Sequence, residues 1–284
     1  MKKILFAIAS VMTLTLTSCF ESKNEITETF PRIVTINTSD GLLKLIADYT
    51  EEEIKGEDIE NLKTPEQLAK FGLADAKRAQ VELELVTDYS NRTRTLTLLQ
   101  GEKIDIQSVT NRAITDSLRP LRSWMTRPIN GGFADIIISN NKGGYLTASS
   151  SAYTYPLVWV SEGYLNVMPV IPSDDAGKYY LTAEKVVSDT LYFRLDAAYE
   201  PNESKELRED GLQSFDLRTL KNTADADQEQ RAKMAEALEA IKEHRFDSMR
   251  IVLTGKFEWT KINGKDTIGD MKAITDYFKC EFIQ

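Results

Sequence analysis

The sequence predicts a mainly β protein with two β-rich domains and two short helices. In residues 80–85 and 191–196, apolar and polar side chains alternate, which is the pattern of half-buried strands. The pair Asn263-Gly264 between two strand-like runs indicates a tight β-hairpin. Pro and Gly residues cluster between about 116 and 156, and this clustering indicates a boundary between the domains.

The N-terminus carries the features of an export signal. Two lysines precede an apolar run over residues 4–16, which ends in small residues. That run is shorter than the roughly 20 residues needed to span a bilayer. Residues 16–19 (LTSC) resemble a bacterial lipobox, which implies cleavage of the leader 1–18 and lipidation of Cys19. The alternative is an ordinary secreted protein with a chance cysteine. Residues 19–27 are short and polar and are expected to form a tether.

The use of cysteine predicts a protein without an internal disulfide. Once Cys19 is assigned to the lipid, Cys280 is the only remaining thiol. The period-two pattern places Cys280 on the same strand face as Phe278 and Phe282. We therefore interpret it as a small buried side chain rather than a reactive thiol.

A short helix is predicted in the first domain, between the strands. Thr64 provides an N-cap, Pro65 suits the first helical position and Gln67 completes a capping box. Gly72 is expected to end this helix. Alternating residues 80–85 and 103–106 follow it as strands.

A longer helix is predicted near residues 225–244 of the second domain. Asp225 is the expected cap, and an apolar stripe is expected to pack over a sheet. The members of that stripe are Met234, Leu238 and Ile241. His244, the only histidine, lies at the expected C-terminus of the helix, where it suits the helix dipole.

Charge and composition argue against several functional classes. Loss of two leader lysines, from 35 basic against 44 acidic residues, changes the formal charge from −9 to −11. A chain this acidic repels phosphate backbones, so we expect no nucleic-acid partner. A single histidine disfavours a Ser-His-Asp enzyme or a histidine-based metal site, and we predict no metal and no cofactor. The acidic run 225–229 resembles a calcium loop, but Gln230 occupies the position where that loop needs glycine.

No catalytic motif points to an enzyme. The sequence has no G-x-S-x-G, P-loop, H-E-x-x-H or C-x-x-C pattern, so we predict no catalytic residues. Two carboxylates that converge in space could still form a hydrolase site, and this stays the third functional hypothesis.

Aromatic residues supply the candidate ligand contacts. Tyr and Trp are concentrated around a Ser-rich stretch, a composition that is used for stacking on sugar rings. Because both are also good strand residues, we favour packing for most of them. Three are retained as candidates for ligand binding: Trp124, Tyr153 and Tyr155.

Four Asp-Ser/Thr-apolar tripeptides resemble the O-glycosylation acceptor of Bacteroidetes. They are also ordinary turn chemistry, so both interpretations stay open. The tripeptides begin at Asp116, Asp189, Asp247 and Asp266.

The C-terminal half is similar to NigD-like lipoproteins of Bacteroidetes. The resemblance covers residues 155–260 best and is carried by four segments in family order. These segments are 161–167 (SEGYLNV), 189–199 (DTLYFRLDAAY), 211–218 (GLQSFDLR) and 247–253 (DSMRIVL). Within them, we interpret Asp216 and Arg218 as fold determinants that can pair along a strand.

This resemblance implies an OB-like barrel over 28–115, a linker or insertion over 116–152 and an immunoglobulin-like sandwich over 153–284. It implies no catalytic residue and no cofactor. The expected function is therefore a non-catalytic, lipid-anchored outer-membrane protein that binds a protein partner, with an immunity role as one form. The alternative is a glycan-binding surface module, and the side of the membrane stays open.

Overall fold

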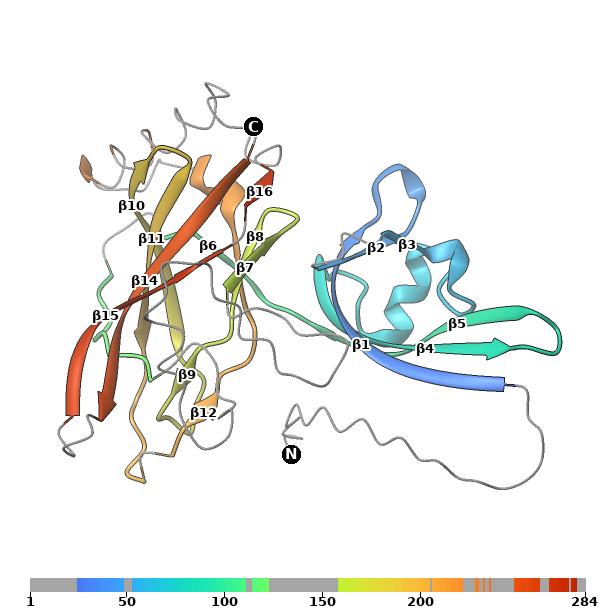
Figure 1. Cartoon of the computed structure of the whole chain (residues 1–284), viewed down its shortest axis with the longest axis horizontal. Helices are drawn as coiled ribbons and strands as arrows, with labels where there is room; N and C mark the ends of the chain where they lie inside the picture. Colours follow the sequence, from blue (N-terminus) through green and yellow to red (C-terminus); the bar gives the residue numbers. More distant parts are fainter. Residues whose placement is uncertain are drawn as a thin grey trace.

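The computed structural model describes residues 25–48, 53–110, 114–122, 158–204, 206–221, 248–260, 266–275 and 277–279, together with residues 228, 229, 232 and 235. The prediction of a mainly β protein is confirmed, since strands arranged in several sheets dominate these residues. In Figure 1 the molecule is elongated, with a sandwich of sheets at one end and a smaller sheet at the other. No helix among the described residues is long and apolar enough to cross a membrane.

The N-terminal unit is a five-stranded antiparallel sheet in the order β3-β2-β1-β4-β5. Its strands are β1 (Glu25–Asn37), β2 (Lys44–Ala47), β3 (Glu53–Lys55), β4 (Arg78–Asp88) and β5 (Thr93–Lys103). Short 3₁₀ turns join them: η1 (Ser39–Gly41), η2 (Gly56–Asp58) and η3 (Pro65–Phe71). The predicted strand 80–85 lies within β4, where Val81 and Leu83 are buried as the alternation indicates.

This sheet stays open, so the barrel expected for the first domain is not confirmed. Ile59, just past η2, forms one isolated parallel bridge to Leu96 of β5. The Asn61 side chain then takes the place of a backbone partner, donating to the Leu98 carbonyl (2.7 Å) and accepting from its N–H (3.0 Å). One bridge and one side chain therefore join the segment after β3 to β5 at the opposite edge of the sheet, where a closed barrel needs a continuous ladder of backbone hydrogen bonds.

The predicted helix at residues 64–72 forms as the 3₁₀ helix η3 rather than an α-helix. The Thr64 N–H donates to Gln67 Oε1 (3.2 Å), which is the backbone half of the expected capping box. Gly72 ends the turn with a left-handed φ of +71°. Because η3 has only seven residues, burial of Leu68 against the sheet stabilises it more than helix propensity does.

Gly56 allows the loop after β3 to pack closely on the segment before β2. A Cβ placed there would lie 2.9 Å from Leu43 Cβ and 2.9 Å from the Leu62 carbonyl oxygen, and neither atom can rotate away. We expect Gly56→Ala to lower the free energy of unfolding by about 1–3 kcal/mol. Urea denaturation measures this, with Glu57→Ala on the exposed side of the same turn as the control. Equal stability of the two variants would contradict the packing argument.

The C-terminal unit consists of two facing sheets and a short strand pair. The first sheet has the order β10-β11-β14-β15, with β16 also paired to β14; the second has the order β6-β13-β8-β7. Their strands are β6 (Ile106–Ser108), β7 (Val158–Ser161), β8 (Tyr164–Val167), β10 (Lys178–Val187), β11 (Thr190–Ala198), β13 (Gln213–Asp216), β14 (Ser248–Thr260), β15 (Asp266–Ile274) and β16 (Phe278–Lys279). The separate pair is β9 (Val170–Ile171) with β12 (Arg208–Glu209), and η4 (Leu217–Lys221) follows β13.

Two strand pairs in this unit are parallel: β11 with β14, and β6 with β13. The chain entering from the first sheet thus contributes β6 directly to the second unit. The immunoglobulin-like assignment is not confirmed. The hairpin expected around Asn263-Gly264 is confirmed by the antiparallel pairing of β14 and β15, although the turn itself lies outside the described residues.

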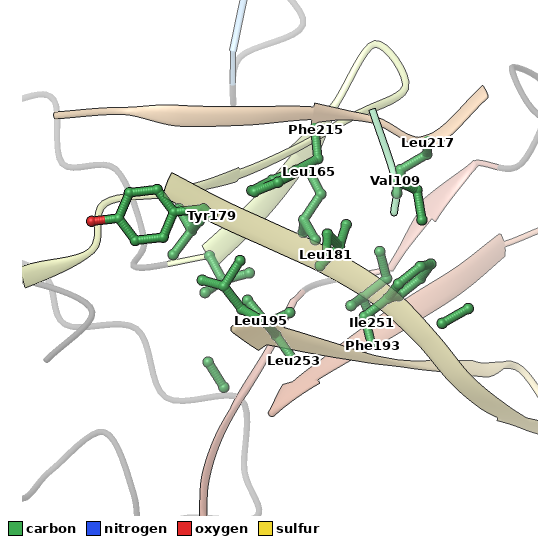
Figure 2. Close-up of a cluster of buried hydrophobic side chains, with 14 of the residues drawn as sticks. Val109, Leu165, Tyr179, Leu181, Phe193, Leu195, Phe215, Leu217, Ile251 and Leu253 are labelled. Atoms are coloured by element: carbon green, nitrogen blue, oxygen red, sulfur yellow. The ribbon is translucent and has the colours of Figure 1, made fainter. Parts of the chain in front are cut away.

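One apolar core fills the space between the two facing sheets. Figure 2 shows Leu181, Phe193 and Leu253 of the first sheet directed toward Leu165 and Phe215 of the second. The first unit has its own core under its sheet, formed by residues such as Val34, Leu45, Leu68, Val81 and Leu83. Each unit therefore has an apolar interior of its own.

Candidate functional site

Most residues singled out from the sequence lie outside the described residues. They are Cys19, Trp124, Tyr153, Tyr155, His244 and Cys280. The second predicted helix is described only at residues 228, 229, 232 and 235, which are helical and exposed. Of the other aromatic residues, Trp159 and Tyr164 are buried, which confirms the packing interpretation for these two.

A buried polar network joins the two units. Arg78 of β4 has no exposed side-chain surface and binds Asp48 with both terminal nitrogens, at 3.2 and 2.6 Å. The same guanidinium reaches the second unit, where it donates to Asn166 Oδ1 (3.0 Å) and Ser214 Oγ (3.3 Å). We call Asp48, Arg78, Trp159, Asn166 and Ser214 the domain junction.

The remaining groups of the domain junction satisfy one another. Trp159 Nε1 donates to Asp48 Oδ2 (2.7 Å), so the carboxylate is held from both units. Ser214 Oγ donates to Asn166 Oδ1 (2.6 Å), and Asn166 Nδ2 donates to the Tyr164 carbonyl (3.0 Å). A buried ion pair is tolerated when its remaining donors and acceptors are paired in this way.

Tyr164 extends the junction toward the motif that resembles the NigD-like family. The centre of its ring lies within cation–π distance of two guanidinium groups, 4.9 Å from Arg78 Cζ and 4.5 Å from Arg218 Cζ. Arg218 Nε in turn donates to Asp216 Oδ1 (2.7 Å), the pairing that the sequence indicates. Because the five junction residues are buried, we assign them to fixing the two units together and not to holding a ligand.

A second buried carboxylate is also structural. Asp210 Oδ2 accepts from Tyr179 Oη (2.7 Å) and from the Gly177 N–H (2.6 Å), and Arg208 lies 3.3 Å from the other oxygen. Burial raises the pKa of Tyr179 well above its ordinary value, and the Asp210 charge raises it further. The phenol therefore stays a hydrogen-bond donor at physiological pH.

An exposed patch lies on the outer face of the first sandwich sheet, at the end of the β10–β11 hairpin. Register places Lys185 opposite Tyr192, and Val187 opposite Thr190, which pairs with Arg250 of β14. The side chains of these residues lie on the face of the sheet opposite the buried Leu191 and Phe193, and Val187 is 50% exposed. We call Lys185, Val187, Tyr192, Arg250 and Tyr277 the sandwich-end patch.

Cation–π contacts and hydrogen bonds order this patch. Lys185 Nζ lies 4.7 Å from the centre of the Tyr192 ring. Arg250 Cζ lies 5.4 Å from the centre of the Tyr277 ring, and Tyr277 is 55% exposed. Tyr277 Oη donates to Asp189 Oδ2 (2.8 Å). The aromatic groups are thus held in place at the surface before any ligand arrives.

The Asp189 contact has a defined pH dependence. The Tyr277 hydroxyl holds the pKa of Asp189 below its ordinary value of 3.8. A carboxyl whose pKa is lower in the folded than in the unfolded chain stabilises the fold above the ordinary value and loses that effect as the pH falls. The ordered form of the patch therefore persists throughout the neutral range.

Sequence reasoning did not find the sandwich-end patch. Alternation in 191–196 does place Tyr192 opposite the core-facing side chains, but Arg250 and Tyr277 are far away along the chain. Only the parallel pairing of β11 with β14 brings Arg250 beside Thr190. No local motif marks such a juxtaposition.

One of the four glycosylation tripeptides is inaccessible in the folded chain. Thr190 is 4% exposed, and its Oγ1 donates to Asp189 (3.0 Å) and accepts from Arg250 (3.1 Å). Ser117, in contrast, is exposed. Among the described residues, no group of three or more His, Cys, Asp or Glu side chains could hold a metal ion.

Comparison with solved structures gives several matches. A candidate lipoprotein from Bacteroides fragilis superposes with a TM-score of 0.50 at 11% identity, over 89% of this chain and all 100% of its own. A NigD-like immunity protein from Bacteroides caccae superposes with a TM-score of 0.39 at 12% identity, over 85% of this chain and 91% of its own. A candidate toxin-related protein from Parabacteroides distasonis gives 0.43 at 10% identity, over 90% and 96%.

These neighbours include both a NigD-like protein and a candidate Bacteroides lipoprotein, as the sequence resemblance predicts. At such identity the likeness to the Bacteroides fragilis protein shows a shared fold alone. No protein-family model matches the chain, and no curated protein matches it.

Proposed function

We propose that this chain is a non-catalytic, lipid-anchored protein of the cell envelope that binds a protein partner through the sandwich-end patch. The observation that carries the proposal is the patch itself, where exposed Val187 and Tyr277 lie beside Arg250 and Lys185. Tyr and Arg are the residues most enriched at the energetic centres of protein interfaces. The family resemblance adds the hypothesis that the partner is a toxin and the role is immunity.

The domain assignment belongs to the same proposal. The strand order β3-β2-β1-β4-β5, with η3 between β3 and β4, supports an OB-like first domain whose barrel is left open. Two facing sheets around one core support a sandwich of immunoglobulin-like type as the second domain. Fold type does not decide the ligand of either domain.

The anchor is tested by Cys19→Ala. We expect the variant to lose lipid labelling and to leave the outer-membrane fraction, because several acyl chains are needed for stable anchoring. Cys280→Ala is the control, with wild-type fractionation expected. Full membrane retention of Cys19→Ala would refute the anchor. Protease shaving of intact cells then distinguishes the outer surface from the periplasmic side.

The partner site is tested by photo-cross-linking in intact cells. A photoreactive residue at position 187 is expected to capture a protein, and the adduct is expected to fall at least about five-fold with Tyr277→Ala. The same group at Ile268, which is 59% exposed on the same sheet face, is the matched control and should capture none of it. Equal capture from both positions would contradict the patch assignment.

A glycan-binding surface is the alternative, and the exposed Tyr277 ring is the observation that favours it. Such a ring can stack on a sugar while Arg250 or Lys185 donates to its hydroxyl groups. In this case a set of envelope and host glycans should contain one that raises the melting temperature of the full chain. That rise should vanish with Tyr277→Ala if the patch is the site, and with Trp124→Ala if the sequence-derived candidate is.

A further inference from the structure

The end of the molecule that holds the start of β1 is remote from the sandwich. Glu25, the first residue of β1, pairs with Asp88 at the end of β4, directly before the turn into β5. This three-stranded ribbon reaches out from the first sheet, and in Figure 1 its end lies at the opposite end of the long axis from the sandwich. We call residues 25–26 and 88–94 the ribbon tip.

The length of the tether fixes how far the ribbon tip can lie from a lipid on Cys19. Six peptide units separate Cys19 from Glu25. Fully extended, they span about 20 Å. β1 has 13 residues, so it carries the chain about 40 Å further before its other end. An anchored Cys19 therefore keeps the start of β1, and with it the ribbon tip, within about 20 Å of the lipid.

The ribbon tip has the surface chemistry of a membrane interface. Tyr89 is 61% exposed and Ile26 is 49% exposed. Tyr rings are enriched at the headgroup level, where one end is apolar and the other is wet. Arg92 and Arg94 are exposed next to them, and neither forms an ion pair with any described residue. Guanidinium groups match phosphate geometry and are attracted to anionic lipid.

The turn that carries these groups is ordered by its own hydrogen bonds. Asp88 Oδ1 accepts from the N–H groups of Ser90 (2.8 Å) and Asn91 (3.1 Å), and Oδ2 accepts from Asn91 Nδ2 (2.6 Å). These bonds hold the pKa of Asp88 below its ordinary value, so the turn is intact at neutral pH. The Asp88 carboxylate is thus occupied within the turn, while Arg92 and Arg94 are exposed to solvent, as is Glu25 at the start of β1.

We propose that the ribbon tip binds the phosphate headgroups of the membrane to which Cys19 is anchored, so that the chain stands on the bilayer with its sandwich held away. The proposal rests on the lipid anchor of the proposed function. It explains how a protein on a short tether keeps the sandwich-end patch accessible to a partner in solution. Tyr89 and Ile26 enter the interfacial layer, and Arg92 and Arg94 contact phosphate.

Fluorescence quenching in vesicles tests the proposal with the full lipidated chain. The vesicles contain phosphatidylethanolamine and phosphatidylglycerol, with a quencher on a fraction of the headgroups. A fluorophore is placed on Thr93→Cys at the tip or on Leu42→Cys, both in a Cys280→Ser background. Thr93 is exposed, and Leu42, 61% exposed beyond the far end of β1, is the matched control. We expect quenching at Thr93 to exceed that at Leu42 at least about three-fold.

The outcomes separate the anchor from the docking. A chain that fails to float with the vesicles lacks the anchor and overturns both proposals. A chain that floats but is quenched equally at both positions, or more at Leu42, keeps the anchor and overturns the docking of the tip.

A second set of variants separates headgroup binding from tethering alone. We expect Arg92→Glu with Arg94→Glu, and separately Ile26→Ser with Tyr89→Ser, to reduce quenching at Thr93 at least about two-fold while flotation is unchanged. Leu42→Ser is the control and should have no effect. If all variants keep wild-type quenching, the tether alone sets the position and the tip does not bind headgroups. If the fluorescence at Thr93 responds to an added soluble protein and not to the quencher-bearing lipid, the ribbon tip binds a protein and the proposal is overturned.

Discussion

Replacing Arg78 with methionine is expected to lower the free energy of unfolding by about 3–5 kcal/mol, because it leaves the Asp48 carboxylate charged and buried without its partner. Arg78 is completely buried, and both oxygens of Asp48 accept from its guanidinium. The loss also removes the bonds to Asn166 and Ser214 across the domain junction. The measurement is urea denaturation followed by fluorescence and circular dichroism.

The matched control for this prediction is Lys44→Met, which breaks the Lys44–Glu53 ion pair (3.0 Å) between β2 and the edge strand β3 of the same sheet. Its side chains are 35% and 41% exposed, so the expected change is below about 1 kcal/mol. If the two variants lose the same stability, the junction is not the energetic link between the units. Because Arg78 binds both units, we also expect its variant to unfold in two steps where the wild type unfolds in one.

Replacing Phe193 with alanine is expected to lower the free energy of unfolding by about 3–5 kcal/mol, since it empties the centre of the sandwich core. Phe193 is 1% exposed and lies among Leu181, Ile251 and Leu253 in Figure 2. These neighbours come from β10 and β14, the two strands that are hydrogen-bonded to β11 on either side, which limits how far they can collapse into the space. Because the cavity cannot close, we expect the loss of unfolding free energy to lie at the upper end of that range.

Ile268→Ala on the outer face of the same unit is the control, with a change expected within about 0.5 kcal/mol. Ile268 is 59% exposed and lies on the face of β15 that points away from the core. A Phe193 variant as stable as this control would show that the two sheets do not share one tightly packed interior. The midpoint should shift without a large change in the denaturant slope if the transition stays cooperative.

Local patterns in the sequence predicted the elements whose causes are local. Alternation predicted that Leu191, Phe193 and Leu195 share one face, and all three are buried in the sandwich core. Gly72 was predicted to end the first helix, and it adopts the left-handed conformation that glycine favours. The type of helix was not predicted, because seven residues packed on a sheet form a 3₁₀ helix whose shape depends on the sheet below.

The domain junction and the sandwich-end patch were not predicted from the sequence, because their residues are distant from one another along the chain. Arg78 lies in a strand with an ordinary alternating pattern, and no neighbouring residue in the sequence indicates Asp48, Asn166 or Ser214 as its partners. Asn166 and Ser214 reach Arg78 only when the first sheet packs against the strands β8 and β13. Similarly, Tyr277 and Arg250 become one surface only through the pairing of β14 with β11 and through contact with Asp189.

The sequence by itself determined the mainly β class and the positions of its best strands; the export signal and the lipidation of Cys19 stay predictions from the sequence. The class and the strand positions follow from side-chain period, capping and turn chemistry, which act over a few residues. The tertiary structure alone decided the open first sheet, the parallel strand pairs, the buried Arg78–Asp48 junction and the exposed patch around Tyr277. Each of these depends on which distant strands become neighbours, and that choice is made by the packing of whole sheets rather than by any local run of residues.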